Sequence, residues 1–63
     1  MRMSLKAARV DVGLTQQALA DMVNVNKKTI ISWENGRSFP DADKIGLICK
    51  AVGRNYDEIR WRP

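Results

Sequence analysis

The order of apolar and polar residues along this chain predicts a succession of short amphipathic helices. Apolar residues recur three, four and seven positions apart, a spacing that places them on one face of a helix. The inward-facing residues of five such segments are Leu5, Ala8 and Val12; Leu19, Ala20 and Val23; Ile30 and Trp33; Ile45, Ile48, Cys49 and Val52; and Ile59. No segment shows the alternation of a half-buried strand. We therefore expect an all-α domain with five short helices around one core.

Residues that favour helix ends separate these segments. Side chains that accept hydrogen bonds from free backbone N–H groups precede the five helices at Ser4, Thr15, Asn26, Asp41 and Asn55. Residues that tolerate a left-handed backbone follow the first four at Gly13, Asn24, Gly36 and Gly53. The expected bounds are Gln16–Val23 for the second helix, Lys27–Asn35 for the third and Asn55–Trp61 for the fifth.

The second and third predicted helices are separated by a very short connection, residues 24–26. Such a connection is too short for a crossover and suits a sharp turn between two helices. Ala20 is small where the helices would cross closely, and Val25 would fill the inside of the turn. The spacing therefore predicts two helices at a steep angle, which is the geometry that presents one helix to a DNA major groove.

Composition narrows the function further. The 63 residues form one expected domain, 1–63, and the net charge of +4 favours a polyanionic partner. The chain has no histidine and a single cysteine, Cys49, so the commonest general base, a disulfide and a zinc cluster are all missing. No apolar run approaches the roughly 20 residues of a membrane span. We expect a cytoplasmic, non-enzymatic protein without metal or cofactor, and we interpret Cys49 as a small buried hydrophobic residue.

Two charged residues fall on inward-facing positions. Arg9 lies between Ala8 and Val12 on the first helix, and Glu34 lies beside Ile30 on the third, counted in 100° steps. A charge drawn into a core requires a partner. We therefore predict a partly buried ion pair between Arg9 and Glu34. The alternative is that both side chains extend to solvent.

The stretch GLTQQALADMVNVNKKTIISWENGR, residues 13–37, resembles the helix-turn-helix core of the lambdoid phage repressor and Cro family, also called the XRE type. The likeness extends to the first helix and to VGRNYDEI, residues 52–59, and the family carries an Arg–Glu pair at positions matching Arg9 and Glu34. The resemblance implies a lambda-repressor-like fold and a third helix that reads double-stranded DNA. It also implies a homodimer on a pseudo-palindromic operator in a bacterial or phage-encoded, nucleoid-associated regulator.

The outward face of the third helix contains Lys28, Ile31, Ser32 and Asn35, with Lys27 at its exposed end. The resemblance implies that Lys27, Lys28 and Ser32 read bases, and Ile31 is either a contact to a thymine methyl or an isolated surface residue. The expected phosphate contacts are Gln16, Thr15, Asn26, Asn35 and Arg37. Thr15 is also expected to act as an N-cap.

Three features depart from the family pattern or extend beyond it. The loop after Gly36 contains only one basic residue, Arg37, so we expect modest phosphate affinity with a shallow salt dependence. Arg54 occupies a position that is usually apolar. Leu47, Tyr56 and Trp61 form a candidate dimer or partner surface, unless Trp61 folds back to complete the core.

The sequence therefore predicts a small DNA-binding transcriptional regulator, in the simplest case a repressor or Cro-like protein. One alternative is an antitoxin-type regulator of the same fold that also binds a partner protein. A second alternative is a protein-interaction module that has lost DNA binding, although Lys27, Lys28 and Asn35 argue against it.

Overall fold

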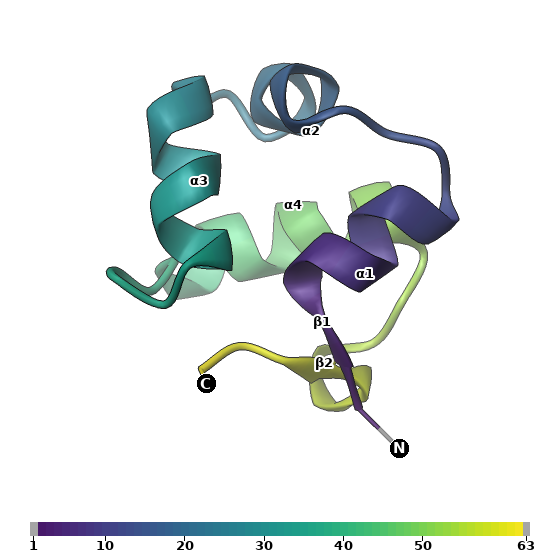
Figure 1. The fold of residues 1–63 in the computed structure, drawn as a ribbon. Coiled ribbons are helices and arrows are strands. Elements are labelled where there is room, and N and C mark those ends of the chain that lie inside the picture. Colours follow the sequence, from purple (N-terminus) through teal and green to yellow (C-terminus); the bar gives the residue numbers. More distant parts are fainter. Residues whose placement is uncertain (1, 63) are drawn as a thin grey trace.

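In the computed structural model, which describes residues 2–62, the chain forms four α-helices, a 3-10 turn and a two-stranded sheet (Figure 1). In chain order the elements are β1 (Met3–Ser4), α1 (Leu5–Asp11), α2 (Gln16–Met22), α3 (Lys27–Glu34), α4 (Ala42–Val52), the 3-10 turn η1 (Tyr56–Glu58) and β2 (Ile59–Arg60). The first four predicted helices are confirmed, and the predicted ends of α2 and α3 are each one residue too long.

The predicted helix ends are formed by local hydrogen bonds. The four N-cap side chains accept from backbone N–H groups at 2.9–3.0 Å: Ser4 from Ala7, Thr15 from Ala18, Asn26 from Lys28 and Asp41 from Lys44. Asn24 has a φ of 59°, the left-handed backbone expected between α2 and α3. These bonds involve residues close in sequence, so the helix boundaries follow directly from residue type.

The fifth predicted helix, Asn55–Trp61, is wrong beyond its first turn. Asn55 starts the 3-10 turn η1, and its backbone N–H donates to Glu58 Oε1 at 2.8 Å. The chain then extends into β2, which pairs in parallel with β1 so that Met3 lies opposite Ile59. In a helix, Ile59 and Trp61 would point in nearly opposite directions, whereas an extended backbone turns both inward. The domain is therefore mostly helical, and the all-α prediction misses the small sheet.

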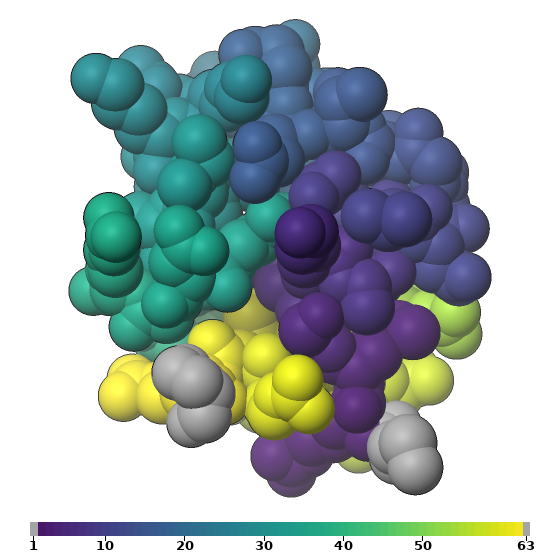
Figure 2. All heavy atoms as spheres, viewed as in Figure 1, coloured from purple at the N-terminus to yellow at the C-terminus, as the bar shows by residue number. Residues whose placement is uncertain are grey.

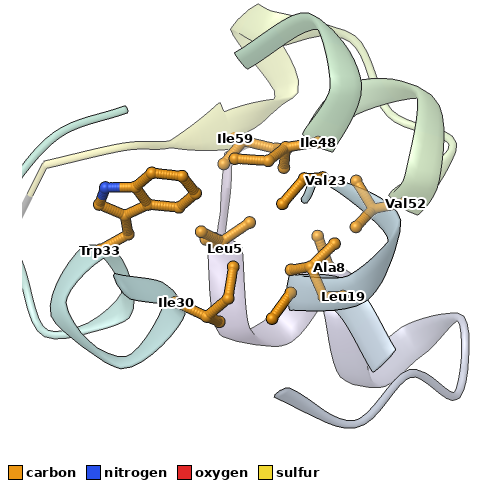
Figure 3. Close-up of a cluster of buried hydrophobic side chains, with 10 residues drawn as sticks. Leu5, Ala8, Leu19, Val23, Ile30, Trp33, Ile48, Val52 and Ile59 are labelled. Carbon is orange, nitrogen blue, oxygen red and sulfur yellow. The ribbon is translucent and has the colours of Figure 1, made fainter. Parts of the chain in front are cut away.

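The core lies where the four helices and β2 meet (Figure 3). Its buried apolar side chains are Leu5, Ala8, Leu19, Ala20, Val23, Ile30, Trp33, Ile48, Val52 and Ile59. Val12 is not among them, because it follows the end of α1 and its side chain points to solvent. Ile45 and Cys49 are half-buried rather than buried. Desolvation raises the pKa of the Cys49 thiol, which favours the protonated form.

Trp61 folds back against the core instead of extending from it. Its indole N–H donates to the Tyr56 carbonyl at 2.9 Å, and the two rings stack with centroids 5.8 Å apart. Phe39, from the loop after α3, meets the indole edge-on at 6.4 Å. The interpretation in which Trp61 completes the core therefore agrees with the structure.

The predicted ion pair between Arg9 and Glu34 is confirmed. Arg9 Nε lies 2.6 Å from Glu34 Oε2, and the two side chains are only 8% and 4% exposed. Arg9 Nη1 donates to the Leu14 carbonyl at 2.8 Å, and Gln16 Nε2 donates to Glu34 Oε1 at 3.1 Å. One polar cluster therefore connects α1, the start of α2 and the last turn of α3.

Breaking this ion pair from one side should be more damaging than removing it altogether. Arg9→Met or Glu34→Leu alone leaves an unpaired charge in the interior, and each should lower the free energy of unfolding by about 3–5 kcal/mol. The double variant leaves no buried charge and should be less destabilised than the sum of the two. Urea unfolding of the wild-type protein, the two single variants and the double variant measures this coupling. Sucrose in the buffer strengthens burial and keeps the weakest variants folded at the start of the titration. Strictly additive losses would contradict it.

The burial of Ile59 beside the paired strands predicts that its side chain contributes to the stability of the core. Ile59→Val removes one buried methylene and should lower the free energy of unfolding by about 0.5–1.5 kcal/mol. Val10→Ala, at a position on α1 that is 56% exposed, is the matched control and should change stability by less than about 0.5 kcal/mol. Equal urea midpoints for the two variants would mean that the C-terminal strand does not contribute to the core.

Candidate nucleic-acid interface

The turn between α2 and α3 is compact and anchored from two sides. The Val25 N–H donates to the Ala20 carbonyl at 2.9 Å, and the Val25 side chain packs against the core. Lys44 of α4 donates from Nζ to the Val23 carbonyl at 3.1 Å. Figure 1 shows α2 nearly end-on and α3 from the side, so the two axes cross instead of running parallel. The predicted helix-turn-helix geometry is therefore present.

One side of α3 is buried and the other is free. Ile30 and Trp33 insert into the core, whereas Lys27 and Lys28 are exposed. In Figure 2, α3 and the loop after it form one edge of the molecule. An α-helix with its side chains is about 10–12 Å across, which fits the roughly 12 Å width of a DNA major groove. The exposed side of α3 can therefore enter such a groove.

Two of the predicted base-reading residues are less free than the lysines. Ser32 and Ile31 are half-buried, and Ser32 Oγ lies 2.7 Å from Ser38 Oγ in the following loop. This hydrogen bond was not predictable from the order of residues, because it depends on how the loop folds back. The lysines therefore provide the most accessible donors on α3.

The predicted phosphate-contacting residues fall into two groups. Thr15 and Asn26 are exposed N-caps of α2 and α3, while Asn35 and Arg37 are exposed at the other end of α3. Gln16 differs from all four, because its amide N–H bonds to Glu34 in the buried cluster. The structure therefore brackets the outward side of α3 with polar groups at both ends.

A shallow hollow joins Thr15 and the start of α3 to α1. Its lining residues are Lys6, Arg9, Thr15, Gln16, Gln17 and Lys27. Lys6 was not among the residues predicted to contact DNA, because it lies on the solvent side of α1, where a lysine carries no distinguishing signal. Within residues 2–62, neither Lys6 nor Lys27 forms a salt bridge with a carboxylate, so the hollow is electropositive.

The remaining unusual residues have separate structural explanations. Arg54, which replaces an apolar residue of the family pattern, forms a 2.6 Å ion pair with Asp11 at the end of α1. Leu47 lines a hollow with Met22, Lys50 and Ala51, whereas Tyr56 and Trp61 line a different hollow with Phe39 and several arginines. The three residues of the candidate dimer surface are therefore divided between two places on the molecule.

Within residues 2–62, no group of three or more His, Cys, Asp or Glu side chains is arranged to hold a metal ion. No helix among these residues is long and apolar enough to cross a membrane.

Comparison with known proteins agrees with this geometry. A family model described as helix-turn-helix matches residues 5–59. The chain is 40% identical over 58 residues to an uncharacterised HTH-type transcriptional regulator of the archaeon Methanothermobacter thermautotrophicus, an alignment that covers 92% of this chain and 84% of the relative. It is 31% identical over 55 residues to the HTH-type transcriptional activator BcrR of Enterococcus faecalis, which covers 87% of this chain and 27% of that protein. No solved structure matches the chain.

The matched span contains the complete helix-turn-helix and the core that holds it. The chain therefore belongs to the helix-turn-helix family of the repressor/Cro (XRE) type, whose members are DNA-binding transcriptional regulators and not enzymes.

Proposed function

We propose that α3 lies in the major groove of duplex DNA and reads base edges with Lys27, Lys28 and Ser32. The observation that carries this proposal is the division of α3 into one buried side and one exposed lysine-bearing side. Lysine donates to guanine O6 and N7, and a serine hydroxyl can bond to several bases. Ile31 is half-buried and contributes, at most, one methyl contact to thymine.

The groups at the two ends of α3 position the domain on the DNA backbone. Asn35 and Arg37 bind phosphates at one end, and Thr15 and Asn26 lie beside a phosphate at the other. Gln16 uses one amide N–H for Glu34 and retains a second N–H for a phosphate oxygen. In this way the buried ion pair aligns a backbone contact with the reading helix.

The regulator acts as a homodimer on a pseudo-palindromic operator and represses by occluding the promoter. Two copies of α3 then enter half-sites one helical turn apart, roughly 34 Å. Occlusion needs nothing beyond the DNA interface. The dimer contact uses one of the two surfaces that expose large apolar residues, Leu47 with Met22 or Tyr56 with its neighbours.

Base-reading and phosphate-binding roles predict different losses on substitution. Lys28→Ala should weaken binding by about 1–3 kcal/mol and relax the preference at one base pair. Asn35→Ala should weaken binding about equally on all sequences. Titrations of duplexes that carry single base-pair changes distinguish the two patterns. A uniform loss for Lys28→Ala would remove it from the base-reading set.

In-vitro selection from a random duplex pool, at near-physiological salt, tests the proposed function as a whole. The expected product is a palindrome with half-site centres about 10 bp apart. Enrichment of a single half-site would instead indicate a monomer that reads sequence. Recovery of no sequence, with binding lost at modest salt, would mean that the basic surface binds DNA only non-specifically.

A further inference from the structure

Residues 59–62, here called the C-terminal strap, alternate between the core and the surface. Ile59 is buried and Trp61 packs against the core, while Arg60 and Arg62 are exposed. This pattern is that of an extended backbone, in which every second side chain points the same way. The strap therefore places two guanidinium groups on one outer side.

Aromatic contacts fix the strap against the loop that follows α3. Phe39 of that loop meets the Trp61 ring edge-on. The Arg62 guanidinium lies over the Phe39 ring, 4.3 Å from its centre. Such a cation–π contact holds the charge in place while leaving its N–H donors free. Arg62 is thus oriented by the loop that contains Arg37.

The two strap arginines lie beside residues already assigned to phosphates. Arg60 lines a hollow together with Asn35 and Gly36 at the end of α3. Arg62 lines a neighbouring hollow together with Arg37. In Figures 1 and 2 the yellow C-terminal segment runs beneath the teal loop, on the side of the molecule where α3 lies.

Neither arginine is needed to cap the end of α3. The carbonyls of Trp33 and Ser32 already accept from the backbone N–H groups of Gly36 and Arg37. Within residues 2–62, no carboxylate forms a salt bridge with Arg60 or Arg62. The strap therefore presents uncompensated positive charge directly next to the proposed DNA interface.

We propose that Arg60 and Arg62 bind phosphates of the DNA backbone and, with Arg37, extend the interface beyond the end of α3. Guanidinium groups suit this task because they bind phosphate oxygens through two parallel N–H donors. The strap then supplies the basic groups that the loop after α3 lacks. The salt dependence of DNA binding is therefore steeper than the sequence of that loop alone predicts. This inference rests on the proposed function, because it assumes that α3 docks on duplex DNA.

Charge favours DNA over a second copy of the chain as the occupant of this surface. Arg2, Arg60 and Arg62 line the same hollow as Tyr56 and Trp61, and Asp57 is the one carboxylate among its lining residues, so the hollow carries a net positive charge. A symmetric contact between two copies would bring these arginines together and cost electrostatic energy. A polyanion neutralises them instead.

The test compares the salt dependence of binding for the wild-type protein, Arg62→Gln, Arg60→Gln and the double variant on one selected duplex. On a duplex with a single half-site, which binds one copy, each lost phosphate contact should reduce the slope of log K against log salt by about 0.9, and the double variant should reduce it by about twice that amount. Base preference should remain unchanged. Arg62→Lys retains a charge over Phe39 and should restore most of the slope.

Lys50→Gln is the matched control, because it removes one exposed charge from the hollow that contains Met22 and Leu47. It is titrated on the same single-half-site duplex, where a change in self-association at this hollow does not enter the slope or the affinity. If the Arg60→Gln, Arg62→Gln double variant has the same affinity and the same slope of log K against log salt as this control, the inference is overturned and the proposed function is left intact. Loss of self-association in sedimentation, with the slope unchanged, would also overturn it and assign the strap to contact between copies. Failure of the wild-type protein to bind any duplex would reject the proposed function itself.

Discussion

The ion pair of Arg9 and Glu34 is the interaction on which the arrangement of this domain depends. Two opposite charges removed from water need each other and further hydrogen bonds, and here the Leu14 carbonyl and the Gln16 amide supply them. The four residues of this cluster come from α1, from the connection to α2 with the first residue of α2, and from α3. Their directional bonds fix how α3 is rotated about its own axis, which apolar contacts alone specify less strictly.

Much of the fold is readable from sequence because it is determined locally. N-caps such as Thr15 and Asp41 bond to N–H groups three residues away, and helical spacing alone places Ile30 in the core. The ion pair was predictable for a related reason, since both charges occupy inward positions of their helices. The small sheet was not, because strands of two residues show no usable alternation and pair across almost the whole chain.

The residues of the candidate DNA interface likewise divide into those that were predictable from sequence and those that were not. The exposure of Lys27 and Lys28 follows from their helical positions, so the sequence indicated it correctly. The bond between Ser32 and Ser38 depends on the path of a loop, and the placement of Lys6 beside the start of α2 depends on how α1 packs. Such groups are brought together only by tertiary structure, and residue type carries no signal for them.

The parallel pairing of Met3 with Ile59 has a consequence for the kinetics of folding. Closing so long a segment of chain costs more entropy than joining α2 to α3, whose contacts are nearly adjacent in sequence. The helix-turn-helix therefore has the local contacts to form early, and the β-pair closes last. In the reverse direction, the end that closes last is the first to open. Amide hydrogens of β2 should then exchange with solvent before those of α3, through openings that leave the reading helix in place.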